Sequence, residues 1–131
     1  MPKEIIKPDK VFDTFSRGFY SHAIRVGNTI YCAGQVGRDR EGMTVGKGDA
    51  GAQAAQAFEN LKAVLEAAGA SLSDVVKTTT YIVNRDDHAK VREARRRYFG
   101  DALPPSTLII VAGLAYPEIL VEIDATAVVE S

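Results

Sequence analysis

The sequence predicts an α+β fold with its elements in the order β-β-α-β-α-β-β and both helices on one face of the sheet. Three observations support this prediction. A long run with helical spacing lies in mid-chain, β-branched runs lie on both sides of it, and turn residues separate the runs. The chain has 131 residues, a length that predicts a single domain over residues 1–131.

The N-terminal part is expected to hold two or three strands and a loop. Its first residues predict a loosely ordered arm with one short strand near Val11–Phe15. The Gly27-Asn28 pair between the runs Ser21–Val26 and Thr29–Ala33 predicts a hairpin, because these residues favour a two-residue turn. Residues Gly34–Gly48 include five glycines and are expected to form a loop whose backbone can approach a ligand closely.

The middle of the chain contains the strongest helical signal. Asp49 is a favourable N-cap, and the apolar residues after it recur at helical spacing until Gly69 ends the pattern. Residues Ser71–Asp74 have capping-box spacing and predict a short turn. The β-branched run Val75–Val83 predicts a central strand.

A second helix and two further strands complete the predicted fold. Either Asp86 or Asp87 is expected to cap a helix that runs through Tyr98. The runs Ser106–Val111 and Ile119–Val129 predict two strands that form a hairpin around a turn at Tyr116–Glu118. Both runs are apolar on both sides, so we expect one face of the sheet to pack on the helices and the other on further subunits.

Glu122 is the leading candidate for chemistry. It lies in the middle of the last predicted strand, among apolar neighbours. A carboxylate is rarely buried without a partner or a function, although a glutamate can also lie on a solvated sheet face.

The composition excludes several classes of partner and location. Sixteen basic and seventeen acidic residues nearly cancel, so neither nucleic acid nor an anionic membrane is an expected partner. No apolar run approaches the roughly 20 residues of a membrane span. Cys32 is the single cysteine and is expected to be a buried, unreactive thiol. Without a disulfide or a signal-peptide pattern, a cytoplasmic location is expected.

Three other patterns have simple structural explanations. Gly46–Gly51 matches the dinucleotide-binding pattern G-x-G-x-x-G, but the run before it is too short for a buried strand, which favours a loop and helix cap. His22 and His88 lie on different elements without a cysteine pair, so no metal site is expected. The basic second helix, which includes Arg92, could bind RNA or a carboxylate, or could form a solvated face.

Several segments together resemble the RidA (YjgF) family, in the same order and at nearly the same spacings. They are Gly18–Ala23, Ala33–Val36, Ala67–Ala70 with Asp74–Thr79, and Pro104-Pro105 with Val121–Ile123. The resemblance implies a chorismate-mutase-like protomer with a mixed sheet, assembled as a barrel-like homotrimer with ligand clefts between neighbouring subunits. It also implies hydrolysis of reactive enamines and imines to 2-oxo acids and ammonia, with no cofactor and no metal.

The resemblance assigns roles to individual residues. Glu122 falls on the family glutamate, which positions the attacking water and transfers protons. Tyr20 falls on a tyrosine that lines the pocket, and Gly34 on a glycine whose backbone contributes to it.

Three positions depart from the family pattern. Ser106 stands where the family has the arginine that binds the substrate carboxylate, Ala33 replaces a serine, and Arg92 replaces a helix asparagine. Losing the arginine would cost about 1.5–3 kcal/mol of charged hydrogen bonding, so an altered substrate choice is expected. Because Ser106 and Arg92 both map to the pocket, one hypothesis is that Arg92 supplies the missing cation.

Two functions therefore remain open. The first is an enamine or imine deaminase with altered substrate choice and Glu122 as the general acid/base. The second is a non-catalytic trimer that binds a small metabolite in the same cleft. Ribonuclease, translation-inhibitor or chaperone activity ranks behind these, and the near-neutral charge argues against the version that binds RNA.

Overall fold

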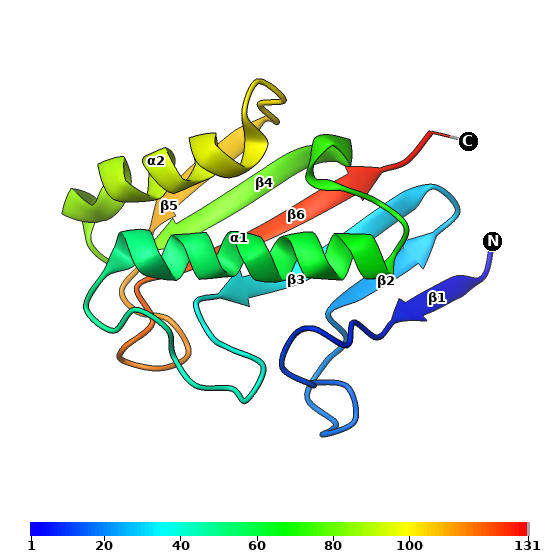
Figure 1. The fold of residues 1–131 in the computed structure, drawn as a ribbon, viewed down its shortest axis with the longest axis horizontal. Helices are drawn as coiled ribbons and strands as arrows, with labels where there is room; N and C mark the ends of the chain where they lie inside the picture. The colour runs from blue at the N-terminus through cyan, green and yellow to red at the C-terminus, as the bar shows by residue number, and fades with distance from the viewer. Residues whose placement is uncertain (131) are drawn as a thin grey trace.

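The computed structural model describes residues 1–130 and places two helices on one face of a six-stranded sheet (Figure 1). The predicted α+β class is confirmed. No helix in this described part of the chain is long and apolar enough to cross a membrane. The elements are β1 (Lys3–Ile6), β2 (Ala23–Val26), β3 (Thr29–Val36), α1 (Ala50–Ala67), the 3-10 helix η1 (Leu72–Asp74), β4 (Val75–Ile82), the 3-10 helix η2 (Arg85–Asp87), α2 (His88–Phe99), β5 (Ser106–Ile110) and β6 (Val121–Val128).

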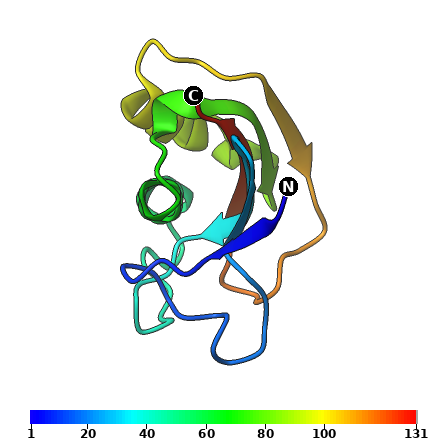
Figure 2. The same ribbon diagram turned by 90° about the vertical axis from the view of Figure 1, so that its right-hand side faces the viewer.

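The strands lie in the order β1-β2-β3-β6-β4-β5, and all neighbouring pairs are antiparallel except β4 and β5. The view along the sheet in Figure 2 shows both helices on the same side of it. The predicted hairpin between the last two strands is wrong, because β4 lies between them. Helix α2 is the crossover that makes β4 and β5 parallel neighbours, whereas residues 111–120 carry the chain past β4 to a place beside β3.

Helix α1 covers the centre of the sheet. Its predicted cap is confirmed, since the Asp49 carboxylate accepts a hydrogen bond from the N–H of Ala52 at 3.1 Å. The buried side of the helix, which includes Leu61, packs against β3 and β6. At the other end, Nη1 of Arg25 donates to the carbonyl oxygen of Ala68 at 2.6 Å. This places a positive charge at the helix C-terminus, where carbonyl groups lack partners within the helix.

The N-terminal strand lies earlier than predicted. β1 covers Lys3–Ile6 and pairs with β2, whereas Val11–Phe15 forms no strand. Side chains hold this segment instead: Val11 is buried, and Oγ1 of Thr14 donates to the carbonyl oxygen of Tyr20 at 2.7 Å. Residues 7–22 therefore form a long loop beside the sheet.

In the middle of the chain, β3 is longer than predicted, whereas the capping box after α1 forms as predicted. β3 continues to Val36 instead of ending at Ala33, because Gln35 and Val36 still pair with β6. The predicted capping box is confirmed by the carboxylate of Asp74, which accepts a hydrogen bond from the N–H of Ser71 at 2.9 Å.

The start of the second helix is capped one turn earlier than predicted. Asp87 precedes α2, but its side chain makes no capping hydrogen bond. Asn84 caps η2 instead, with Oδ1 accepting from the N–H of Asp86 at 2.9 Å. The 3-10 turn was not visible in the sequence pattern, because it adds only a single turn to a helix that was already expected.

The outer face of the sheet, turned away from the helices, is only partly apolar. On β6 it carries Glu122, Asp124 and Thr126, which are half-buried, so the prediction of a strand that is apolar on both sides does not hold for β6. Tyr31 on β3 and Ile109 on β5 are 55% and 41% exposed. The single chain thus leaves large apolar side chains of this sheet open to solvent.

Candidate functional site

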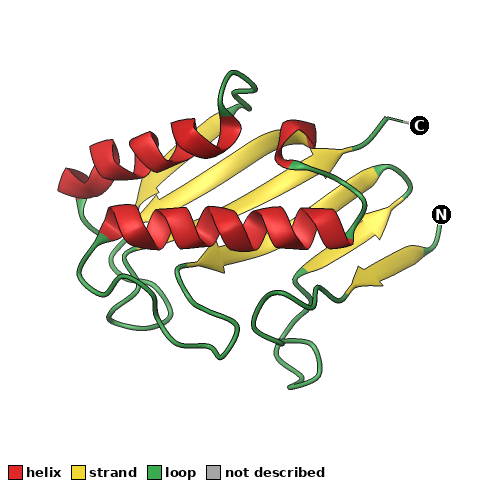
Figure 3. Ribbon diagram, viewed as in Figure 1, coloured by secondary structure: helices red, strands yellow, loops and turns green. Residues whose placement is uncertain are grey.

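Loops at one end of the sheet enclose a cavity of about 670 Å³, which we call the Glu122 cavity. The loop after β3 and the loop before β6 meet there (Figure 3), and Oγ1 of Thr44 donates to Oε1 of Glu118 across them at 3.3 Å. The volume is in the range of small-molecule sites. The lining residues are Phe12, Phe19, Tyr20, Ala33, Gly34, Val36, Arg38, Gly42, Thr44, Ala115, Tyr116, Glu118, Ile119 and Glu122.

A β-bulge in β3 brings Gly34 against Glu122. The register of β3 on β6 shifts after Cys32, so that Ala33 and Gly34 together lie opposite Asp124. A Cβ atom on residue 34 would collide with the carboxyl group of Glu122 and would lie 2.7 Å from its Cδ. Gly34 therefore provides the space that the Glu122 carboxyl group occupies.

The surroundings of Glu122 favour its protonated form. Burial raises the pKa of this carboxyl group, the negative charge of Asp124 raises the pKa further, and Arg38 lowers it in part. Asp124 itself accepts a hydrogen bond from Oη of Tyr81 at 3.1 Å. A glutamate with a raised pKa is better matched to taking up and returning a proton near neutral pH than an ordinary one.

Arg38 also lines the Glu122 cavity, and it was not predicted as a site residue. Its Nη2 donates to Oη of Tyr20 at 2.7 Å, and its guanidinium carbon lies 4.6 Å from the centre of the Phe12 ring. Arg38 belongs to the glycine-rich segment that was expected to approach a ligand. Its place in that segment is only a weak signal in the sequence, because the strand before it was expected to end at Ala33 and in fact continues to Val36.

The structure brings together three of the five predicted site residues. Tyr20, Gly34 and Glu122 all line the Glu122 cavity. Ser106 is the first residue of the edge strand β5, and Arg92 lines a separate hollow on α2 with Arg96 and Arg97, together with two other residues. Neither Ser106 nor Arg92 lines the Glu122 cavity of the same chain.

Arg95, rather than Arg92, is the cation that contacts Ser106. Nη1 of Arg95 donates to Oγ of Ser106 at 2.7 Å. Partial burial lowers the pKa of Arg95, and the positive charge of Arg92 lowers it further. Among the described residues, no hydrogen bond joins Arg92 to Ser106, and the proposal that Arg92 supplies the missing cation stays a hypothesis.

His22 and Gln35 support the wall behind Tyr20. Nε2 of His22 lies 2.7 Å from the carbonyl oxygen of Phe12 and must donate to it, which leaves Nδ1 to accept from Nε2 of Gln35 at 3.1 Å. Burial lowers the pKa of His22, in agreement with a neutral ring. Both ring nitrogens are thus used inside the chain. Residues 1–130 contain no cluster of three His, Cys, Asp or Glu side chains that could hold a metal ion.

Cys32 is buried in β3, as predicted. Burial raises the pKa of its thiol to about 12, and the nearby charge of Asp124 adds to this effect. The thiol is therefore protonated at neutral pH and a poor nucleophile.

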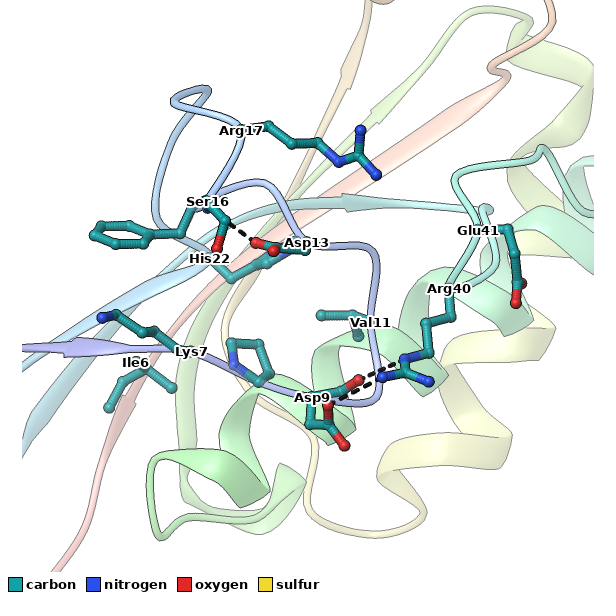
Figure 4. A pocket seen from close by; sticks show the side chains of 12 residues that line it. Ile6, Lys7, Asp9, Val11, Asp13, Ser16, Arg17, His22, Arg40 and Glu41 are labelled. Carbon is teal, nitrogen blue, oxygen red and sulfur yellow. Dashed lines mark hydrogen bonds and ion pairs between the residues drawn. The ribbon is translucent and has the colours of Figure 1, made fainter.

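A second cavity, of about 560 Å³, is lined mainly by the N-terminal loop (Figure 4), and we call it the Asp9 cavity. Nη2 of Arg40 lies 3.0 Å from Oδ1 of Asp9, and Nε of Arg40 donates to the carbonyl oxygen of Asp9 at 2.8 Å. Oδ1 of Asp13 accepts a hydrogen bond from the N–H of Ser16 at 3.0 Å. None of the five predicted site residues lines this cavity.

Comparisons with known proteins show which family the chain is similar to. The model of the Endoribonuclease L-PSP family matches residues 13–129. A RutC family protein of Pyrococcus abyssi is 42% identical over 127 residues, which cover 97% of this chain and 98% of the relative. A 2-iminobutanoate/2-iminopropanoate deaminase of Mus musculus is 40% identical over 111 residues, covering 85% of this chain and 82% of the relative.

Solved structures with the same fold include members of this family. RidA from an Antarctic Psychrobacter has a TM-score of 0.88 and 38% identity, with 96% of this chain and 99% of that chain covered. E. coli TdcF with bound serine has a TM-score of 0.88 and 27% identity, with coverages of 97% and 99%. The chain therefore belongs to the Endoribonuclease L-PSP family, which is the RidA (YjgF) family that its sequence resembles.

Proposed function

We propose that this protein is an imine deaminase, which hydrolyses a reactive enamine or imine to a 2-oxo compound and ammonia with Glu122 as the general acid/base. The placement of Glu122 carries the proposal: its carboxyl group lies on the bulge at Gly34, within a cavity, with a raised pKa. Relatives at 35–40% identity are named 2-iminobutanoate/2-iminopropanoate deaminase, which supports the same reaction here.

The reaction needs one group that first takes and then returns a proton. Glu122 takes a proton from water while the water oxygen bonds to the imine carbon, and the electron pair of the C=N bond moves to nitrogen. Protonated Glu122 then gives this proton to the nitrogen, which forms a neutral carbinolamine. Glu122 next takes the hydroxyl proton and transfers it to the same nitrogen, so that the C=O bond forms while the C–N bond breaks and ammonia leaves. One imine and one water thus give one 2-oxo compound and one ammonia.

Tyr20 and Gly34 are proposed to bind the substrate beside Glu122. The Tyr20 hydroxyl lies on the wall of the Glu122 cavity, and the backbone of Gly34 borders the Glu122 carboxyl group without an intervening side chain. A substrate in this cavity can thus approach both the general acid/base and polar backbone groups.

A coupled assay tests the proposed reaction. Imines are generated from several L-amino acids with an amino acid oxidase, and the release of ammonia is compared with and without the protein. We expect wild type to accelerate release and Glu122→Gln to lose about 100- to 10,000-fold of the acceleration. Glu41→Gln, in the Asp9 cavity, is the matched control and should act like wild type. Equal rates in buffer and with wild type, on every imine tried, would contradict the proposal.

We also propose that the protein assembles as a homotrimer with its outer sheet faces packed together. Exposed Tyr31 and Ile109 on that face support an assembly that covers them. In such a trimer the ligand cleft would lie between neighbouring subunits, as the family resemblance implies. Size-exclusion chromatography with light scattering should give three times the chain mass of 14.1 kDa, and a monomer would contradict this arrangement.

A metabolite-binding protein without turnover is the second candidate. Ser106, at the position where the family resemblance places an arginine, favours it, and the relative from Pyrococcus abyssi is named only as a RutC family protein. Tight binding of a 2-oxo acid together with no acceleration of imine hydrolysis would favour this candidate over the deaminase.

A further inference from the structure

The Glu122 cavity contains a cation whose charge is not neutralised. Within residues 1–130, the only hydrogen bond of the Arg38 side chain goes to Oη of Tyr20, and no carboxylate lies within 4.0 Å of its guanidinium group. A guanidinium carries five N–H donors in a planar fork that matches a carboxylate. Most of the Arg38 donors are therefore available to a ligand in the cavity.

The backbone of Arg38 is held in place from the helix side. Nδ2 of the buried Asn60, on α1, donates to the carbonyl oxygens of Val36 at 3.0 Å and of Arg38 at 2.9 Å. The N–H of Arg38 also donates to the carbonyl oxygen of Val36 at 2.9 Å. A buried amide thus fixes the point at which the chain leaves β3, and with it the origin of the Arg38 side chain.

The guanidinium group itself is held by an aromatic face. It stacks on Phe12, and the Phe12 ring is packed against Gly42, where a Cβ atom would lie 2.6 Å from a ring carbon. Gly42 has a φ of +88°, so this residue leaves space for the ring and adopts a backbone conformation that other residues disfavour. Phe12 and Tyr20 together hold the cation, which lowers the entropy lost when a ligand binds.

Arg38 and Glu122 line the same cavity but do not pair with each other. A ligand with a carboxylate at one end can therefore bind Arg38 and still present its other end to Glu122. Glu118, the other carboxylate of the cavity, accepts a hydrogen bond from Thr44 at 3.3 Å. This arrangement favours a small acid over a neutral ligand, because only the acid matches the available donors of Arg38.

We propose that Arg38 is the carboxylate-binding residue of this site and selects 2-imino acids over neutral imines. The selection of 2-imino acids as substrates rests on the proposed function, whereas the binding of a small acid by Arg38 does not. Arg38 is not at position 106, where the family resemblance places the carboxylate-binding arginine, and it does not lie on β5. It binds the acid from the loop after β3, within the same chain as Glu122.

Calorimetry with 2-oxobutanoate and its neutral amide tests this role. We expect wild type to bind the acid more tightly than the amide, and Arg38→Gln to lose about 10- to 100-fold in affinity for the acid but not for the amide. Arg40→Gln removes the same charge from the same loop but lines the Asp9 cavity, so it should bind the acid like wild type. Arg38→Lys should recover part of the affinity, because it restores the charge without the planar fork.

Two outcomes would overturn the inference. One is wild type that binds acid and amide equally or binds neither, a result that does not depend on whether a variant folds. The other is Arg38→Gln with unchanged affinity for the acid and a wild-type melting temperature. The imine assay distinguishes failure of this inference from failure of the proposed function. Turnover that Arg38→Gln leaves unchanged would contradict only the role of Arg38. Acid binding through Arg38 without any turnover would contradict only the deaminase activity.

Discussion

The Glu122 cavity and the Asp9 cavity each receive one arginine from the loop after β3, and the two arginines differ in their partners. Arg40 pairs with Asp9 at 3.0 Å, and both side chains are mostly in solvent, with exposures of 63% and 92%. Arg38 stacks on Phe12, binds the Tyr20 hydroxyl and has no carboxylate partner within residues 1–130.

This difference indicates which cavity is built for a ligand. An exposed ion pair neutralises its own charges and contributes little to stability. A half-buried cation without a partner charge contributes no ion pair to the fold and keeps its N–H donors for a ligand. We therefore expect substitutions around the Glu122 cavity to affect activity. Substitutions around the Asp9 cavity should change activity and stability very little.

The largest effect is expected at Gly34. Gly34→Ala should displace the Glu122 carboxyl group, because the new Cβ atom needs the same space, and should lower turnover about 100-fold. Stability should change little, since the displaced atoms belong to a side chain that can rotate. Gly113→Ala is the control, because a Cβ atom there meets nothing within 4 Å. Equal turnover in both variants, measured in the imine assay, would contradict the assigned contact.

The next effect is expected at Asn60, which anchors the loop that carries Arg38. Asn60→Ala should reduce the free energy of unfolding by about 1–3 kcal/mol, because two carbonyl oxygens lose their donor, and should also weaken binding of 2-oxobutanoate. Gln56→Ala removes only the side chain that donates to Asn60 Oδ1, and should cost less. Urea denaturation measures both variants, and a wild-type midpoint for Asn60→Ala would show that the loop is held by other contacts.

A smaller effect is expected in the pH dependence of turnover. Glu122 must be ionised to take a proton from water, so turnover falls as the pH drops through its pKa. Arg38→Gln removes the charge that lowers this pKa and should move the acidic limb to higher pH. Asp124→Asn removes a charge that raises the pKa and should move the limb to lower pH. Profiles of kcat at saturating imine test this, and shifts in the same direction would contradict the assignment.

The smallest effect is expected in the Asp9 cavity. Asp9→Asn removes the ion pair with Arg40 but leaves the hydrogen bond from Arg40 Nε to the carbonyl oxygen of residue 9. Because the pair is exposed, neither the urea midpoint nor the affinity for 2-oxobutanoate should change measurably. A clear loss of acid binding in this variant would show that the two cavities act together.

Elements that depend on nearby residues could be predicted from the sequence. The Asp49 cap, the helical spacing after it and the Gly27-Asn28 hairpin all involve residues within a few positions of one another. β1 was missed because Lys3–Ile6 is short and is stabilised by pairing with β2, far along the chain. The place of β6 beside β4 was missed for the same reason, since strand order depends on contacts between distant segments.

The residues of the candidate site also differ in how far the sequence could predict them. Glu122, Gly34 and Tyr20 lie in segments with a recognisable pattern, and the structure places them in one cavity. Arg38 has no such pattern, because its position depends on Phe12 and on Asn60, which is 22 residues away in sequence. Their contacts form only when the loop, the N-terminal segment and α1 pack together.

The contact between Gly34 and Glu122 also limits how this protein can evolve. With a methyl group at position 34, the acid at position 122 can keep its present place in the cavity only if it becomes shorter. The two positions are therefore expected to change together among its descendants, so that one can serve as a marker for the other when lineages with different chemistry are sorted.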